Sequence, residues 1–140
     1  MVALITLLLM IGTSCMRKMI RLSLLLNIAV LIPVCLGLLL DAAWVVHAYG
    51  TATAARGILL SVYGAILIVS TVLLLRQEAM LVAPLLLVQV VYKLTTPLTV
   101  GSLQNPVVIS NIVIAAVHLA TLSLILREMR RPVPEPAAAR

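Results

Sequence analysis

The chain has 140 residues, of which 64% are hydrophobic and only 10% are charged, and this composition excludes a water-soluble globular domain. It predicts a small membrane protein that forms one bundle and has no separate soluble domain. The formal net charge of +6 does not indicate nucleic-acid binding, because the chain has no Phe, only one Trp and three Tyr, and its basic residues cluster at the ends of apolar segments.

The first fifteen residues, 1–15, are apolar but too short to cross a membrane. They lack the basic start of a secretory signal, whereas Met16 is followed directly by basic residues. One interpretation is that Met16 is the true initiator and residues 1–15 are an over-called extension. The other is that residues 1–15 form a helix lying in the membrane interface.

Four later segments are long and apolar enough to span a hydrocarbon core of ~30 Å, which takes about 20 helical residues. Backbone groups in lipid must bond to one another, so these segments are predicted to be helices. The predicted spans are residues 22–40, 57–75, 79–96 and 107–126. The sequence therefore predicts an all-α fold, a four-transmembrane-helix bundle over residues 16–128, with residues 129–140 as a disordered, proline-rich cytoplasmic tail.

Basic residues set the predicted orientation, because loops rich in Lys and Arg stay in the cytoplasm. They precede the first span, separate the second from the third, and follow the fourth: Arg17, Lys18, Arg21, Arg76, Arg127, Arg130 and Arg131. Both termini are therefore predicted to be cytoplasmic.

Two polar features belong to the first span and the outer connection that follows it. Asn27 lies within the apolar run, where a hydrogen bond to another helix is the expected role and ligand binding is the alternative. After Asp41, the aromatic side chains around His47 predict an interfacial segment on the outer side.

Polar residues in the second and third spans are arranged on common helix faces. Arg56 and Tyr63 are seven residues apart, and Gln89 lies within one turn of Tyr92 and Lys93. The polar side chains toward the outer end therefore form a candidate ligand-binding cluster. Its members are Asp41, His47, Arg56, Tyr63, Gln89, Tyr92 and Lys93.

The fourth span begins after Asn105, which can cap the helix ahead of Pro106. Within it, Asn111 and His118 are seven residues apart and share a face. A buried histidine of this kind is expected to be hydrogen-bonded structure, with proton transfer or ligand binding as the alternative. The sequence shows neither the thiolate nor the carboxylate partners of a metal site.

Lys93 is the one charged residue within the third span. Pro97 disfavours the helical conformation of the residue before it, so the third helix is predicted to end near Thr95. Lys93 then lies in the last turn of this helix. Its side chain then either extends outward to the lipid headgroups or points inward to Asp41 and Arg56.

The stretches "ARGILLSVYGAIL" in the second span and "LLLVQVVYKLTTPL" in the third resemble small four-helix bacterial membrane proteins of the DoxX-like and DUF4345-like groups. This resemblance implies a bacterial inner-membrane location and a four-helix bundle. Some DoxX relatives are subunits of quinone-linked oxidoreductases, so it also makes a quinone a possible ligand. The resemblance assigns no catalytic residue.

Three functional classes fit these features. The preferred one is an accessory or structural membrane component without catalytic activity of its own, acting in the lipid bilayer as a homo-oligomer or within a larger membrane complex. The second is a membrane subunit of a quinone- or lipid-linked oxidoreductase, although the sequence has no haem-ligating His pair. The third is a small transporter acting as a dimer, with Asn111 and His118 as pathway residues.

Overall fold

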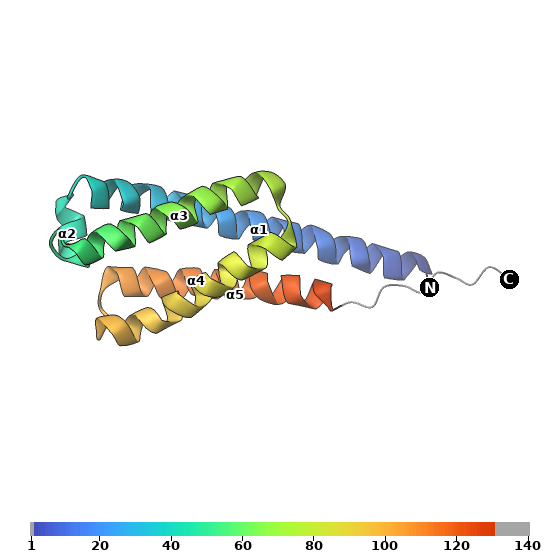
Figure 1. Cartoon of the computed structure of the whole chain (residues 1–140). Coiled ribbons are helices and arrows are strands. Elements are labelled where there is room, and N and C mark those ends of the chain that lie inside the picture. Colours follow the sequence, from blue (N-terminus) through green and yellow to red (C-terminus); the bar gives the residue numbers. More distant parts are fainter. Residues whose placement is uncertain (1, 131–140) are drawn as a thin grey trace.

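The structure is a computed structural model that describes the backbone of residues 2–130 and the side chains of residues 12–130. Within this range all regular structure is helical (Figure 1). The helices are α1 (Val2–Leu39), α2 (Ala43–Tyr49), α3 (Ala54–Arg76), α4 (Ala79–Val100) and α5 (Pro106–Met129). The predicted all-α fold is thus confirmed, while most of the predicted tail, residues 131–140, lies outside the described part.

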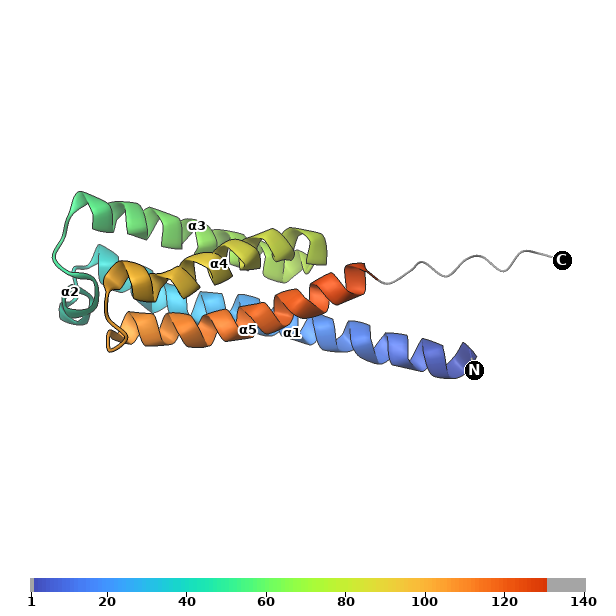
Figure 2. The same cartoon turned by 90° about the horizontal axis from the view of Figure 1, so that it is seen from below.

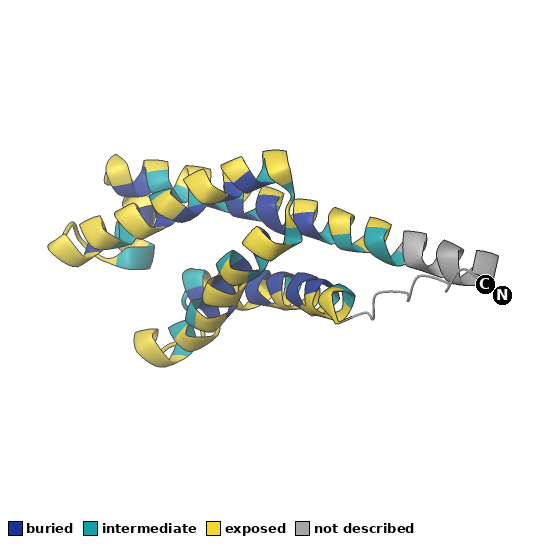
Figure 3. Cartoon of the chain, turned by 45° about the vertical axis from the view of Figure 1, so that its right-hand side comes forward, coloured by how far each residue is buried: buried dark blue, intermediate teal, exposed yellow. Residues whose placement is uncertain are grey.

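Four of the helices are long and apolar enough to cross a membrane: α1 from Gly12 onward, α3, α4 and α5. Their outer faces carry large apolar side chains that no other helix covers, as the exposed faces in Figure 3 show. Leu75 is 84% exposed and Leu98 is 83% exposed. Such faces are suited to lipid and would be unfavourable in water, which supports a multi-pass membrane protein.

Local hydrogen bonds explain where several helices begin and end. The Thr53 hydroxyl accepts a bond from the backbone N–H of Arg56 at the start of α3, and the Asn105 carbonyl oxygen accepts one from Val107 at the start of α5. The predicted cap at Asn105 is therefore confirmed. Gln77 ends α3 in the left-handed conformation, with φ 53°, and this allows the chain to turn directly into α4.

The predicted end of the third helix near Thr95 is wrong, because α4 continues through Pro97 to Val100. Proline is more frequent in membrane helices than in soluble ones. In the turn before Pro97, the Thr95 and Thr96 hydroxyls both donate to the Tyr92 carbonyl, at 3.0 and 2.8 Å, and add hydrogen bonds to that turn. The helix is terminated by the residue after Val100, Gly101, whose positive φ of 69° suits a glycine.

The first helix is longer than the predicted span. Residues 2–15 continue α1 without a break, and the helix projects beyond the bundle at the end where α1 begins and α5 ends (Figures 1 and 2). Whether translation starts at Met16 stays a prediction.

The four long helices pack as two pairs, α1 with α3 and α4 with α5, and the contact between α1 and α5 joins the pairs. In contrast, α3 and α4 make few contacts although they are consecutive in the chain. In Figure 3 the two pairs diverge toward the end that carries α2, which we call the α2 end. The opposite end, with the α3–α4 connection, is the terminal end.

The distribution of apolar side chains matches this divergence. At the terminal end all four long helices contribute to one core, which consists of Ile20, Leu24, Leu73, Val82, Leu86 and Ile125. Toward the α2 end, the buried members of the second core come only from α1, α2 and α3: Leu31, Leu38, Val45, Tyr63 and Ile66. Of α4, only the partly buried Leu85 and Tyr92 pack against this core, so among the described residues the α2 end holds α3 to α4 less tightly than the terminal end does.

Buried polar side chains connect the helices across the centre of the bundle. Asn27 of α1 donates to the Ser70 hydroxyl of α3 at 3.0 Å, and its carbonyl oxygen bonds His118 of α5 at 2.9 Å. Closer to the terminal end, Ser23 and Thr121 share a hydrogen bond of 2.8 Å. Asn27 and His118 thus make the interhelical hydrogen bonds that the sequence predicts for them.

Replacing Asn27 by leucine is expected to lower the free energy of unfolding by about 1–2 kcal/mol, because Ser70 and His118 both lose their partner in a dry interior. Reversible unfolding in mixed micelles measures the change. The matched control is Thr71→Val, which removes an exposed hydroxyl bonded only within α3. If both variants unfold at the same free energy, Asn27 does not hold the helices together.

Candidate functional site

The α2 end is closed by Arg56, which connects α1, α3 and the segment between them. Its guanidinium donates to the Asp41 carboxylate at 2.7 Å, to the Gly50 carbonyl at 2.7 Å and to the Leu38 carbonyl at 3.3 Å. Arg56 is only 7% exposed, so these oxygens replace the water that its charge loses. The predicted proximity of Asp41 and Arg56 is confirmed as an ion pair, and its contacts assign it a structural role.

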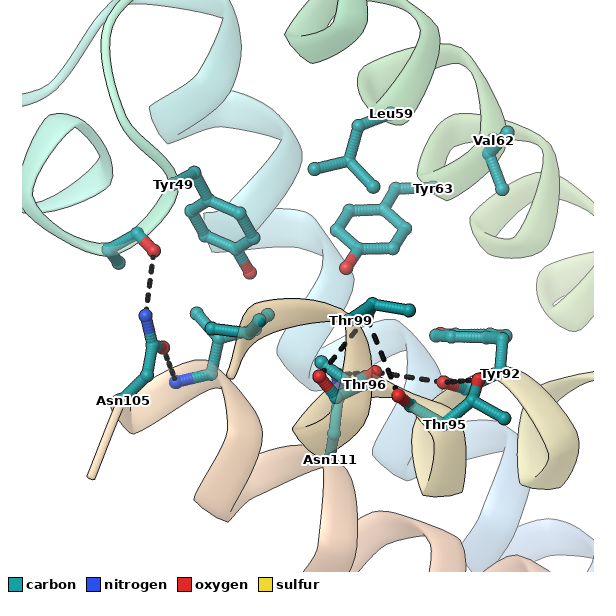
Figure 4. Close-up of a pocket in the computed structure, with 13 residues that line it drawn as sticks. Tyr49, Leu59, Val62, Tyr63, Tyr92, Thr95, Thr96, Thr99, Asn105 and Asn111 are labelled. Atoms are coloured by element: carbon teal, nitrogen blue, oxygen red, sulfur yellow. Dashed lines mark hydrogen bonds between the residues drawn. The ribbon is translucent and has the colours of Figure 1, made fainter. Parts of the chain in front are cut away.

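A pocket of about 550 Å³ lies beside this closure, where α3 and α4 diverge. Its walls come from α2, α3, α4, the start of α5 and the residue before it, and Figure 4 shows the residues that line it. The exposed side chains of Val62 and Thr99 belong to these walls, so the pocket opens on the face of the bundle between α3 and α4. We call it the α3–α4 pocket.

Three tyrosines from three helices line the α3–α4 pocket: Tyr49 of α2, Tyr63 of α3 and Tyr92 of α4. The rings of Tyr49 and Tyr63 meet edge to face with centroids 6.4 Å apart, and both hydroxyls point into the space between α3 and the α4–α5 pair (Figure 4). Burial raises the pKa of the Tyr49 phenol above its ordinary range, so this hydroxyl stays protonated and neutral. The Tyr92 hydroxyl is buried and has no protein partner.

The opposite wall of the pocket carries threonine and asparagine side chains from α4 and α5. Thr96 donates its hydroxyl proton to the Tyr92 carbonyl at 2.8 Å, and Thr99 donates to the Thr96 carbonyl at 3.1 Å (Figure 4). The Asn111 amide nitrogen donates to the Thr96 hydroxyl oxygen at 3.2 Å. These bonds fix the orientation of the three side chains. The residues that line the pocket are polar or apolar, and none of them is charged.

Lys93 lies directly behind this wall, so the inward direction is confirmed, while the outward direction and the predicted partners Asp41 and Arg56 are wrong. The side chain is 4% exposed, so it does not reach the lipid headgroups. It points inward, but its ammonium group donates to the Asn111 carbonyl oxygen at 3.1 Å and not to Asp41, which pairs with Arg56. The physical reason is the helix face: Lys93 shares a face with Gln89, and this face packs against α5.

The surroundings of Lys93 leave its charge without a counter-ion in the described part of the chain. Its ammonium group contacts the Asn111 oxygen and the Tyr92 ring, whose centroid lies 4.8 Å from the ammonium nitrogen. Both are neutral groups that favour a cation. The α3–α4 pocket is therefore bordered on one side by a buried positive charge, one hydrogen bond removed from its surface.

A second polar layer lies deeper in the bundle. Gln89 is 1% exposed and neither atom of its amide has a protein partner, and the Nδ1 atom of His118 is likewise unpaired. Because the Asn27 amide nitrogen donates to Ser70, its oxygen faces His118, so the Nε2 atom of His118 carries the donated proton. In neutral His118, Nδ1 is then an acceptor.

The structure divides the sequence-predicted residues into three groups. Tyr63, Tyr92 and Asn111 line the α3–α4 pocket, with Lys93 behind them. Asp41 and Arg56 close the α2 end without lining the pocket, and His47 is exposed on α2 outside it. The remaining three, Asn27, Gln89 and His118, are buried deeper between the helices.

The threonines and Tyr49 line the pocket although the sequence pattern did not identify them as site residues. Tyr92, Thr95, Thr96 and Thr99 follow the spacing of one helix face, so they form a polar stripe along α4. The stripe was hidden because the helix was predicted to end at its second member. Tyr49 is one of the aromatic side chains around His47 that predict an interfacial segment, and only the position of α2 places it against Tyr63.

No family model matches this chain, and neither a curated protein nor a solved structure matches it. Among the described residues, no group of three or more His, Cys, Asp or Glu side chains is placed to hold a metal ion. The chemical character of the site therefore comes from its hydroxyl and amide groups and from Lys93.

Replacing Gln89 by leucine is expected to raise the free energy of unfolding by about 1 kcal/mol, because the variant no longer buries an unpaired amide. Thermal unfolding in detergent measures the effect. Gln77→Leu is the control, because the Gln77 amide bonds both Arg21 and the Leu74 carbonyl and its loss should not stabilise the protein. A lower melting temperature for Gln89→Leu would contradict this interpretation.

Proposed function

We propose that this protein is an accessory component of a bacterial cytoplasmic membrane and binds the head of a lipid-soluble amphiphile in the α3–α4 pocket. It acts without catalytic activity of its own, by presenting or retaining this ligand beside a partner protein or a second copy of the chain. The observation that carries the proposal is the pocket itself, a mostly apolar space with a few hydroxyl and amide groups that opens between two lipid-facing helices.

The composition of the pocket supports this class of ligand. Its volume of about 550 Å³ is in the range of small-molecule sites, which are mostly apolar with a few polar groups that fix orientation. The tyrosine and threonine side chains supply those polar groups. The opening between α3 and α4 gives an apolar tail a path into the lipid, while the head remains against the hydroxyl groups.

The proposed orientation has both termini in the cytoplasm. The basic residues Arg17, Lys18 and Arg21 lie on α1 toward the terminal end, and Arg21 bonds Gln77 at the α3–α4 connection. A concentration of Lys and Arg at one end favours the cytoplasmic side. The α3–α4 pocket then lies in the outer half of the membrane.

A quinone-linked oxidoreductase subunit is the second candidate, in line with the resemblance to DoxX-like proteins. A quinone has a planar head with two carbonyl acceptors and an apolar isoprenoid tail. The unpaired Tyr92 hydroxyl is a donor that suits such a head. In this case the electrons come from the partner enzyme, and this chain provides the quinone site.

Filling the pocket tests the proposal. Thr99→Trp places an indole at the pocket opening, and it is expected to reduce the amount of amphiphile that copurifies with the protein by about tenfold. Mass spectrometry of the intact protein released from micelles measures the retained ligand. Thr71→Trp, on the exposed face of α3 outside the pocket, should retain as much ligand as the unchanged protein.

The proposal fails if Thr99→Trp, while keeping the melting temperature of the unchanged protein, retains the same amphiphile in the same amount. It also fails if the unchanged protein neither copurifies with an amphiphile nor takes one up from added lipids.

A further inference from the structure

We propose that the α3–α4 pocket selects amphiphiles whose head carries hydrogen-bond acceptor oxygens, and that Lys93 sets this selectivity through Asn111. The inference rests on the proposed function and names the ligand class of the same pocket. A long-chain carboxylic acid and an isoprenoid quinone both present such oxygens, as a carboxylate and as ring carbonyls.

The Asn111 amide has a defined orientation because of Lys93. An ammonium group can only donate, so the Asn111 carbonyl oxygen must face Lys93, at 3.1 Å. The amide NH₂ then faces the opposite way, toward Thr96 and the pocket. One of its two N–H groups bonds Thr96, which leaves the second for a ligand.

The remaining polar groups of the wall also favour an acceptor. The threonine hydroxyl protons of Thr96 and Thr99 are already donated to backbone carbonyls. The buried Tyr92 hydroxyl has no partner among the described residues, and Tyr92 lines the pocket, so its proton is free to be donated to a ligand. The pocket thus offers free donors at Tyr92 and Asn111.

The charge distribution disfavours amphiphiles with a cationic head. Three tyrosine rings by themselves would suit a quaternary ammonium head through cation–π contacts. However, no carboxylate lines the pocket, and the buried Lys93 ammonium lies one hydrogen bond behind its surface. In a medium of low dielectric constant this charge repels a cation and attracts the electron-rich oxygen of a carboxylate or carbonyl.

Matched amphiphiles test the selectivity. Hexadecanoate, hexadecyltrimethylammonium and a short-chain isoprenoid quinone are titrated separately into the protein in lipid nanodiscs, and binding is measured by intact-protein mass spectrometry. At least one of the two oxygen-headed ligands is expected to bind about tenfold more tightly than the cation, as one charge-assisted hydrogen bond allows. The oxygen-headed ligand that binds more tightly identifies the source of the acceptor.

The variants Lys93→Met and Tyr92→Phe separate selectivity from structural damage. Lys93→Met is expected to bring the affinity ratio of oxygen-headed ligand to cation close to one, whereas a merely misfolded pocket would lose all three ligands alike. Tyr92→Phe removes only the hydroxyl, and it should weaken the oxygen-headed ligands without weakening the cation. This variant keeps the test decisive if Lys93→Met does not fold.

Equal binding of all three ligands by the unchanged protein, or a preference for the cation, overturns this inference and leaves the proposed pocket function intact. An unchanged affinity ratio in both variants also overturns it. If none of the three ligands binds, the proposed function fails as well.

Discussion

The hydrogen bond between Asn27 of α1 and His118 of α5 crosses the contact between the two helix pairs, and the Ser23–Thr121 bond lies beside it. In a bilayer, apolar side chains gain little by leaving lipid for one another, so helix association depends on close packing and on buried polar bonds. Asn27 also bonds Ser70 of α3, so one side chain fixes three helices. The relative position of the pairs follows from this contact.

The α3–α4 pocket is a consequence of that pairing. Because α3 packs on α1 and α4 packs on α5, no strong contact holds α3 to α4, and the two diverge from the shared core at the terminal end. The α2 end would separate further without Arg56, which connects α1, α3 and the intervening segment. Tyrosine, threonine and asparagine side chains meet in the resulting space, with Lys93 behind them.

The all-helical fold could be predicted from the sequence, because a long apolar run in lipid must satisfy its own backbone hydrogen bonds. The interhelical hydrogen bonds of Asn27 and His118 could also be predicted, because an isolated polar side chain in lipid needs a partner. The sequence could not predict the partner of Lys93, since helix periodicity shows that Lys93 shares a face with Gln89 but not which helix that face contacts. The predicted end of the third helix was wrong, because α4 continues through Pro97. The Thr95 and Thr96 hydroxyls add hydrogen bonds to the turn before this proline. The pocket itself depends on how α3 and α4 diverge, which no local pattern specifies.

The most direct measurement is the position at which a photoactivatable amphiphile attaches to the protein in a bilayer. A diazirine placed next to the head of a fatty acid, activated by light and followed by peptide mass spectrometry, reports this position. If the pocket holds the head, the labels fall on the α3 and α4 segments that contain Val62 and Thr99, and excess unlabelled fatty acid removes them. Labels spread evenly over the exposed faces of all four long helices, and unaffected by competitor, would contradict a binding pocket.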